Sequence, residues 1–240
     1  MEHIEPTTTI AEIVNQNIRT APVFKKYGLD FCCGGNKELS AACEERGADM
    51  NKVLAELDLV FNASKPEIDF EAMPANELVQ YITDKHHAYI YSNGPVTAEL
   101  IDKVARVHGE RHPETIEIAN LFKKLLSDLH HHMVKEEQIL FPYILKLTRM
   151  DSKDLNLGQI TPFVANPIRV METEHDDAGN MLNRLNELSR GYSPPSDGCN
   201  SFKAAYAQLE DMENDIHMHV HLENNVLFPK AVQLEKKLTE

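Results

Sequence analysis

The stretches HHHMVKEEQILFP and HMHVHLENNVLFP place the same metal-binding residue types at two distant points of the chain. In each, a histidine precedes a glutamate by four residues, and Leu-Phe-Pro follows at the same offset. Residues i and i+4 lie on one face of an α-helix, so His132 and Glu136 point the same way, as do His219 and Glu223. A glutamate has two carboxylate oxygens and can bridge two ions. Two such core-facing pairs on different helices therefore predict a carboxylate-bridged dimetal centre.

One histidine–glutamate pair alone is typical of an exposed ion pair on a helix surface. Two copies, each followed by the same apolar residues and a proline, favour a buried site instead. Further histidines on the remaining helical segments can complete it: His86, His87, His108, His112 and His175. The helical period does not decide between His86 and His87. His112 precedes a proline at a predicted helix start, so we expect it in a loop.

The other histidines fall outside the paired stripe. His130 and His131 are predicted to face solvent, and His217 and His221 lie on a different helix face from Glu223. His3 belongs to the N-terminal tail.

The predicted ligand set favours iron over zinc. Imidazole and carboxylate suit iron and manganese, whereas structural zinc prefers four ligands that usually include thiolates. Five histidines, two bridging glutamates and a bridging oxide or hydroxide leave about one of the roughly twelve positions of two six-coordinate ions open. The sequence thus predicts two iron ions per chain, with room for a small ligand.

Four long amphipathic segments must hold these residues, and turn-rich stretches connect them. Their predicted ranges are 76–107, with a bend near Gly94-Pro95, 113–147, 167–190 and 197–238. No stretch shows convincing β alternation. We predict an all-α protein in which residues 72–240 form an antiparallel four-helix bundle, with Pro142 and Pro229 bending the distal ends of their helices.

Residues 1–65 are predicted to form a separate small helical domain. Its expected helices span 10–27, 37–46 and 50–59, and a polar linker follows over 62–69. The stretch FCCGGN makes a turn ahead of the second helix and contains the adjacent Cys32 and Cys33.

Composition narrows the function further. A formal net charge of −14 argues against duplex DNA or an anionic membrane as the main partner. No apolar run is long enough to span a bilayer, and the first residues lack the features of a secretory signal, so we expect a cytoplasmic protein. Four cysteines, two of them adjacent, do not look like a disulfide framework, whereas twelve histidines in 240 residues point towards metal.

The stretches HHAY, RVHGERHP, HxxxEEQILFP, METEHDDAG and HxxxENNVLFP resemble, in this order, the hemerythrin-like domain of the Repair of Iron Centres proteins. These are di-iron proteins of bacterial nitrosative and oxidative stress. The resemblance covers nearly all of the chain, because the family also has a small N-terminal domain with a vicinal cysteine pair, which APVFKKYGLDFCCGGN matches. The iron ligands that the resemblance implies are His87, His108, His132, Glu136, His175, His219 and Glu223. It selects His87 over His86 and makes the two glutamates bridges. The SNGP stretch of the first bundle helix departs from the family's regular helix.

The cysteine pair is expected to exchange thiols, bind iron or hand it over, since a helix N-terminus favours a thiolate. Cys43 and Cys199 are expected to be structural or incidental. The resemblance implies repair of iron–sulfur clusters, with iron–sulfur proteins as recipients. Two alternative functions remain open: reduction of nitric oxide at the open position, or binding or sensing of dioxygen, against which the cysteine pair counts. A homodimer is left open.

Overall fold

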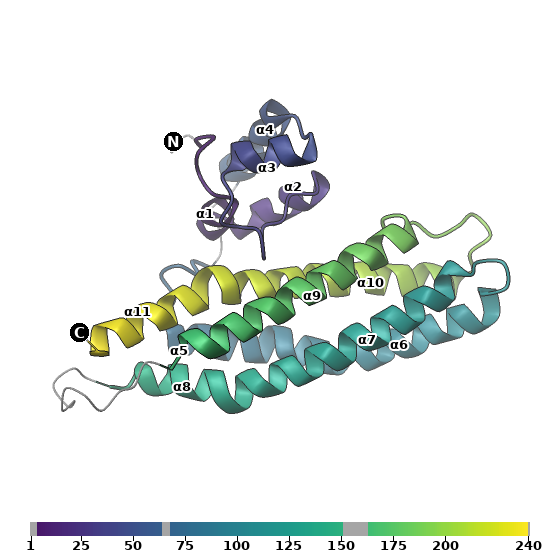
Figure 1. The fold of residues 1–240 in the computed structure, drawn as a ribbon. Coiled ribbons are helices and arrows are strands. Elements are labelled where there is room, and N and C mark those ends of the chain that lie inside the picture. Colours follow the sequence, from purple (N-terminus) through teal and green to yellow (C-terminus); the bar gives the residue numbers. More distant parts are fainter. Residues whose placement is uncertain (1–3, 64–67, 151–162, 240) are drawn as a thin grey trace.

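The structure is a computed structural model that describes residues 4–63, 68–150 and 163–239. Four antiparallel helices form its main body: α6 (Ala88–His108), α7 (Glu114–Lys135), α9 (Ala165–Ser189) and α10 (Asn200–Leu222). Helices α6 and α9 each pack against both α7 and α10, so α7 and α10 lie on a diagonal (Figure 1). This confirms the prediction of an all-α, hemerythrin-like four-helix bundle. None of the described helices is long and apolar enough to cross a membrane.

Three of the bundle helices are interrupted by a π-helical turn. Helix α5 (Ala75–Tyr81) continues through η2 (Ile82–His87) into α6. Helix α7 passes through η3 (Glu136–Leu140) into α8 (Phe141–Leu147), and α10 passes through η4 (Glu223–Leu227) into α11 (Phe228–Thr239). Such turns are rare in helices and are frequently found at functional sites.

Proline accounts for the position of two of these turns. Pro142 and Pro229 have no backbone N–H and cannot donate to the carbonyl four residues earlier, which breaks the α-helical ladder directly after η3 and η4. At Gly94-Pro95, where we predicted a bend, α6 runs through as one helix, and the break lies earlier, at η2. A side chain at Gly94 would collide with Leu126 of α7, so the glycine permits close helix packing there.

Two apolar clusters lie along the bundle. One cluster includes Leu129 and Ile216 and fills the half of the bundle away from α5, α8 and α11. The other includes Ile82 and Leu227 and fills the end formed by α5, α8 and α11. Polar side chains buried between them are therefore held in a medium of low dielectric constant.

The N-terminal unit contains α1 (Ile10–Gln16), η1 (Ile18–Thr20), α2 (Ala21–Lys26), α3 (Leu39–Arg46) and α4 (Met50–Ala63). The prediction of one helix over residues 10–27 was wrong. Asn17 adopts an extended conformation with φ −153°, and its side chain accepts from the Arg19 N–H at 3.1 Å, which ends one helix and starts the next. Helix α4 runs four residues beyond its predicted end, and residues 64–67 of the predicted linker lie outside the described residues.

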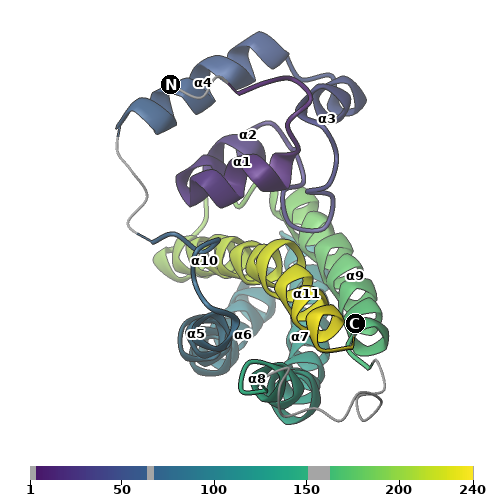
Figure 2. The ribbon, with the colours of Figure 1, turned by 90° about the vertical axis from the view of Figure 1, so that its left-hand side faces the viewer.

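This unit lies on the side of the bundle formed by α9 and α10, with α1 and α2 nearer to the bundle than α3 and α4 (Figures 1 and 2). Its buried side chains belong to the same apolar cluster as those of the adjacent bundle half. Lys25 of α2 also forms an ion pair with Glu213 of α10 at 2.5 Å. The two units thus share one continuous core.

Candidate metal centre

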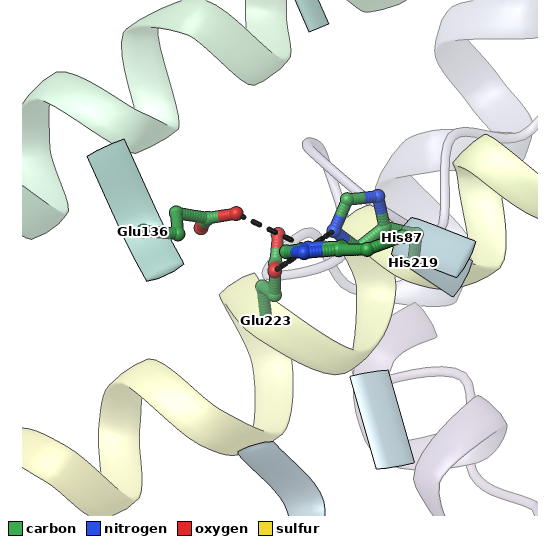
Figure 3. A group of neighbouring side chains, drawn as sticks. All are labelled: His87, Glu136, His219 and Glu223. Carbon is green, nitrogen blue, oxygen red and sulfur yellow. Dashed lines mark hydrogen bonds and ion pairs between the residues drawn. The ribbon is translucent and has the colours of Figure 1, made fainter. Parts of the chain in front are cut away.

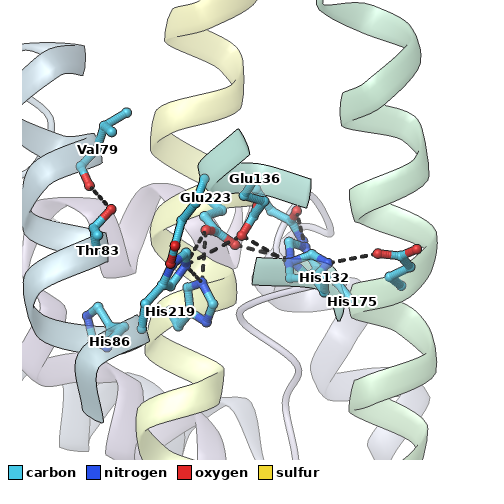
Figure 4. A network of polar contacts seen from close by, with 12 residues as sticks. Val79, Thr83, His86, His132, Glu136, His175, His219 and Glu223 are labelled. Atoms are coloured by element: carbon cyan, nitrogen blue, oxygen red, sulfur yellow. Dashed lines mark hydrogen bonds and ion pairs between the residues drawn. The ribbon is translucent and has the colours of Figure 1, made fainter. Parts of the chain in front are cut away.

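Six side chains that carry metal-ligating atoms meet at the level of the π turns. They come from all four bundle helices and are each at most 2% exposed. They form two groups with common carboxylates: His87, Glu136, His219 and Glu223 in one, and His132, Glu136, His175 and Glu223 in the other. Figures 3 and 4 show these side chains converging on one small volume.

The histidines point ring nitrogens at one another. His87 Nε2 lies 3.1 Å from His219 Nε2, and His132 Nε2 lies 3.0 Å from His175 Nε2. Two ring nitrogens this close can share one proton at most, whereas a metal cation beside them can accept the lone pairs of both. The spacing is that of two nitrogens converging on one ion in each pair.

Each carboxylate touches one histidine of each pair. A Glu136 oxygen lies 3.4 Å from His87 and 3.3 Å from His132, both measured to Nε2. The Glu223 oxygens lie 2.8 Å from His219 and 3.1 Å from His175. Both glutamates therefore stand where a bridge between two ions would be.

Buried oxygens without hydrogen bonds provide a test of the metal fit. Both oxygens of Glu136 and one of Glu223 are fully buried, and no described residue donates a hydrogen bond to them. Leaving buried charged acceptors unsatisfied is costly, and cations satisfy them. The residues present thus fit a pair of metal ions.

Three of the four histidines are fixed through their outer nitrogen. His87 Nδ1 donates to Glu137 at 2.8 Å and His132 Nδ1 donates to Glu174 at 3.0 Å. His175 Nδ1 donates to the side-chain oxygen of Asn224 at 2.8 Å. These bonds set the tautomer that leaves Nε2 free to ligate, and such outer partners raise ligand basicity.

None of these three partners is among the residues predicted from the sequence. Each is the sequence neighbour of a predicted ligand: Glu137 follows Glu136, Glu174 precedes His175, and Asn224 follows Glu223. This adjacency was the signal in the sequence that could have identified them.

The charges of the cluster shift its pKa values strongly. Burial lowers the pKa of His87, but the carboxylates of Glu136 and Glu223 outweigh it and raise that pKa to about 10. Burial also lowers the pKa of His132, and the charge of Glu136 raises it to about 9. Burial holds the pKa of His219 below its usual value. Burial acts to raise the pKa of both carboxylates, but the neighbouring histidines outweigh it. The pKa of Glu136 is therefore lower than usual, and that of Glu223 lies well below its usual range.

Metal binding is therefore expected to displace protons. The raised pKa values keep His87 and His132 protonated at pH 7 without metal, whereas a ligand must be neutral, so loading with iron(II) should release about one proton from each of the two rings, in addition to any proton that a bridging water loses. The release from the rings should vanish as the pH rises through 9 to 10, where both rings are already neutral, so the total release should fall by about two protons per chain. Anaerobic calorimetry in two buffers of different ionisation enthalpy measures it. Proton release that is absent at pH 7, or that grows with pH, would contradict this charge assignment.

The structure does not bring His108 to the centre. His108 is the last residue of α6, which begins directly after His87 and has 21 residues. At a rise of about 1.5 Å per residue, the two histidines are therefore about 30 Å apart. His108 Nε2 instead lies 3.2 Å from Cys199 Sγ, and its ring packs on Phe202. The seven-residue ligand set is thereby reduced to six, with one histidine fewer.

The surplus histidines are also placed. His86 is buried beside the centre, stacked on His219, and its Nδ1 contacts Asp215 at 3.0 Å. His130 and His131 are exposed as predicted, while His221 is buried and its Nδ1 lies 3.2 Å from the Phe31 carbonyl.

The cysteine pair lies at the boundary between the two units. Cys32 is buried and Cys33 is partly exposed, and their sulfurs are 3.9 Å apart as free thiols. Asp30 accepts from the N–H groups of both cysteines at 3.0 Å and forms with their thiols a third group of metal-ligating atoms. The hydrogen bond with Cys33, burial and the charge of Asp30 raise the pKa of the Cys32 thiol well above its usual value, so the expectation that a helix N-terminus favours the thiolate was wrong for Cys32.

Two cavities approach these groups. One, of about 250 Å³, is lined by His132 together with the carboxylates of Asp128, Glu174 and Asp177. The other, of about 450 Å³, lies between the units and is lined by Cys32 and Cys33.

Comparison with known proteins agrees with this arrangement. Residues 6–60 match a domain of unknown function named ScdA_N, and residues 78–231 match the hemerythrin HHE cation-binding domain. The chain is 32% identical to the iron–sulfur cluster repair protein ScdA of Staphylococcus haemolyticus, over 92% of this chain and 96% of that protein. It is 37% identical to the iron–sulfur cluster repair protein YtfE of Musicola paradisiaca, over 90% and 92% of the two chains. The YtfE protein of Yersinia pestis is 33% identical, over 90% and 93%. By its two domains and its full-length relatives, the chain belongs to the ScdA/YtfE family of iron–sulfur cluster repair proteins.

Proposed function

We propose that the protein holds two iron ions and repairs iron–sulfur clusters damaged by nitrosative or oxidative stress, by donating iron to iron–sulfur proteins. The observation that carries the proposal is the pair of buried groups that share Glu136 and Glu223. Each ion would receive two imidazole nitrogens and one oxygen from each glutamate. An oxo or hydroxo bridge would complete five positions, leaving about one open on each six-coordinate ion.

The surroundings of His132 support release of iron as cargo. The carboxylates of Glu174, Asp128 and Asp177 line the cavity beside this ligand, and carboxylate oxygens are suitable ligands for iron in transit. Protonation or displacement of a bridging carboxylate would weaken the binding of both ions at once. The centre would thus hold iron at a buried site, and iron would leave it through the acidic cavity.

The cysteine pair supplies a second place for iron. Asp30, Cys32 and Cys33 offer one carboxylate and two thiols within reach of a single ion, at the edge of the larger cavity. Thiolates bind iron well, and the site lies outside the buried centre. We assign it to receiving or presenting the ion during delivery.

Reduction of nitric oxide is the second candidate. Without His108 each ion would keep about one open position, where the seven-residue set would leave about one in all, and two open positions would suit a reaction between two small molecules. Binding or sensing of dioxygen alone is less favoured, since it gives the docked cysteine pair no role.

The double substitution Cys32→Ala with Cys33→Ala tests delivery. We expect iron content and the optical spectrum to stay near those of the wild type, because no ligand of the centre is changed, while repair slows by about tenfold or more. The assay restores activity to an enzyme whose iron–sulfur cluster has been damaged by nitric oxide, with the iron-loaded variant as the only iron source.

Cys43→Ala, which removes a buried thiol away from the pair, is the matched control. Unchanged repair by the double variant would remove the cysteine pair from delivery. Rapid turnover of nitric oxide without repair would favour the second candidate.

A further inference from the structure

The two copies of the repeated phrase differ directly after the bridging glutamate. The first reads Glu136-Glu137-Gln138, and the second reads Glu223-Asn224-Asn225. Glu137 and Asn224 have equivalent roles, since each accepts the outer N–H of a ligand histidine at 2.8 Å. A carboxylate and an amide thus perform the same task at the two ends of the centre.

Only an amide can also donate. The carboxylates that hold His87 and His132 have acceptor atoms alone, whereas the Asn224 side chain accepts through Oδ1 and donates through Nδ2. Its Nδ2 points at the Cys32 carbonyl, 3.3 Å away. One side chain thereby connects a ligand of the metal centre, His175, with the backbone of the cysteine pair.

The rest of η4 holds the same loop. Asn225 Nδ2 donates to the carbonyls of Cys32 at 3.0 Å and of Phe31 at 3.3 Å. The Asn225 carbonyl, which Pro229 leaves without its helical donor, accepts from Asn15 of α1 at 3.3 Å. The π turn that carries Glu223 is therefore also the edge on which the N-terminal unit docks.

We infer that Asn224 is a positioning residue that couples occupancy of the metal centre to docking of the cysteine loop, residues 30–35. The inference rests on the proposed metal centre. An imidazole that ligates a cation is a stronger N–H donor, so its bond to Asn224 Oδ1 strengthens, and chains of hydrogen bonds polarise one another. The Asn224 amide then holds the Cys32 carbonyl more tightly.

Coupling of this kind is reciprocal. If metal bound at His175 stabilises the docked cysteine loop, undocking of the loop must lower the affinity for that metal by the same factor. Lifting the cysteine loop, as contact with a recipient would require, would then loosen the ion held by His132 and His175. The ion beside the acidic cavity is thereby marked as the first to leave.

The test compares Asn224→Asp with Asn225→Asp in the full-length protein. Both lose the amide donor to the loop, but only Asn224 contacts His175, and a carboxylate there still accepts from the imidazole. The rate of alkylation of Cys32 by iodoacetamide is measured by mass spectrometry with and without iron(II), with exposed Cys199 as internal reference. Bound iron is measured on the same samples.

In the wild type, iron should slow Cys32 alkylation by about fivefold or more. Asn224→Asp should bind iron yet show equal rates with and without it. Asn225→Asp should raise both rates and keep their ratio. A ratio in Asn224→Asp as large as in the wild type would overturn the inference alone, and would indicate iron bound at the thiols themselves. A wild-type protein that binds no iron would overturn the metal centre and the coupling together.

Discussion

Glu136→Ala and Glu223→Ala should each lower iron affinity by at least about 100-fold, so that far less than one iron per chain survives desalting. Each carboxylate contacts a histidine of both pairs, so its loss would remove a ligand from both of the proposed ions and would leave the histidines without a compensating charge. Iron bound per chain after anaerobic loading measures the effect. Glu136→Gln and Glu223→Gln keep the volume but not the charge, and separate ligand loss from misfolding.

His130→Ala and His108→Ala are the matched controls, and both should retain about two irons. His130 is exposed, and its ring lies near the rings of Tyr91 and His131, neither of which belongs to the centre. His108 belongs to the ligand set that the family resemblance implies, but it lies at the other end of α6. Loss of iron from His108→Ala as severe as from Glu136→Ala would show that the centre is placed wrongly. His221 is unsuitable as a control, because it is buried against the cysteine loop.

The core of the site could be predicted from local sequence because helical periodicity links position to direction. A spacing of four residues put each histidine beside its glutamate, and repetition of the phrase on two helices placed both pairs inside the bundle. The burial of Glu136 and Glu223, both 0% exposed, follows from the same periodicity.

Position along a helix axis is harder to infer than direction around it. His87 and His108 share a predicted helix and differ by about six turns, so periodicity allowed both while geometry permits only one at the centre. The choice between His86 and His87 depended on the π turn η2, which shifts the phase of the helix where they stand. Docking of the cysteine loop involves contacts between residues about 190 positions apart, and no local pattern reports such contacts.

Gly35→Ala is expected to lift the cysteine loop from the bundle. A Cβ at Gly35 would lie 2.7 Å from the Phe31 carbonyl oxygen, 3.0 Å from Ala11 and 3.2 Å from Asn225 Oδ1. The first of these atoms is backbone, so the loop itself must move, and the Asn225 contact lies in the docking edge. Cys32, now 6% exposed, should become accessible, and its alkylation should speed up by about tenfold or more.

Gly179→Ala is the control for this variant, because it adds a methyl group at the same boundary without the close contacts. A Cβ there would meet only Cys33 Sγ, at an ordinary contact distance of 3.9 Å, so Cys32 should react at its wild-type rate. Equal rates in the two variants would mean that the loop is not held in place by close packing. If Gly35→Ala alone exposes Cys32 and also speeds loss of iron from the loaded protein, undocking and release are linked. That is the behaviour required of a protein that stores iron in a buried centre and must still deliver it.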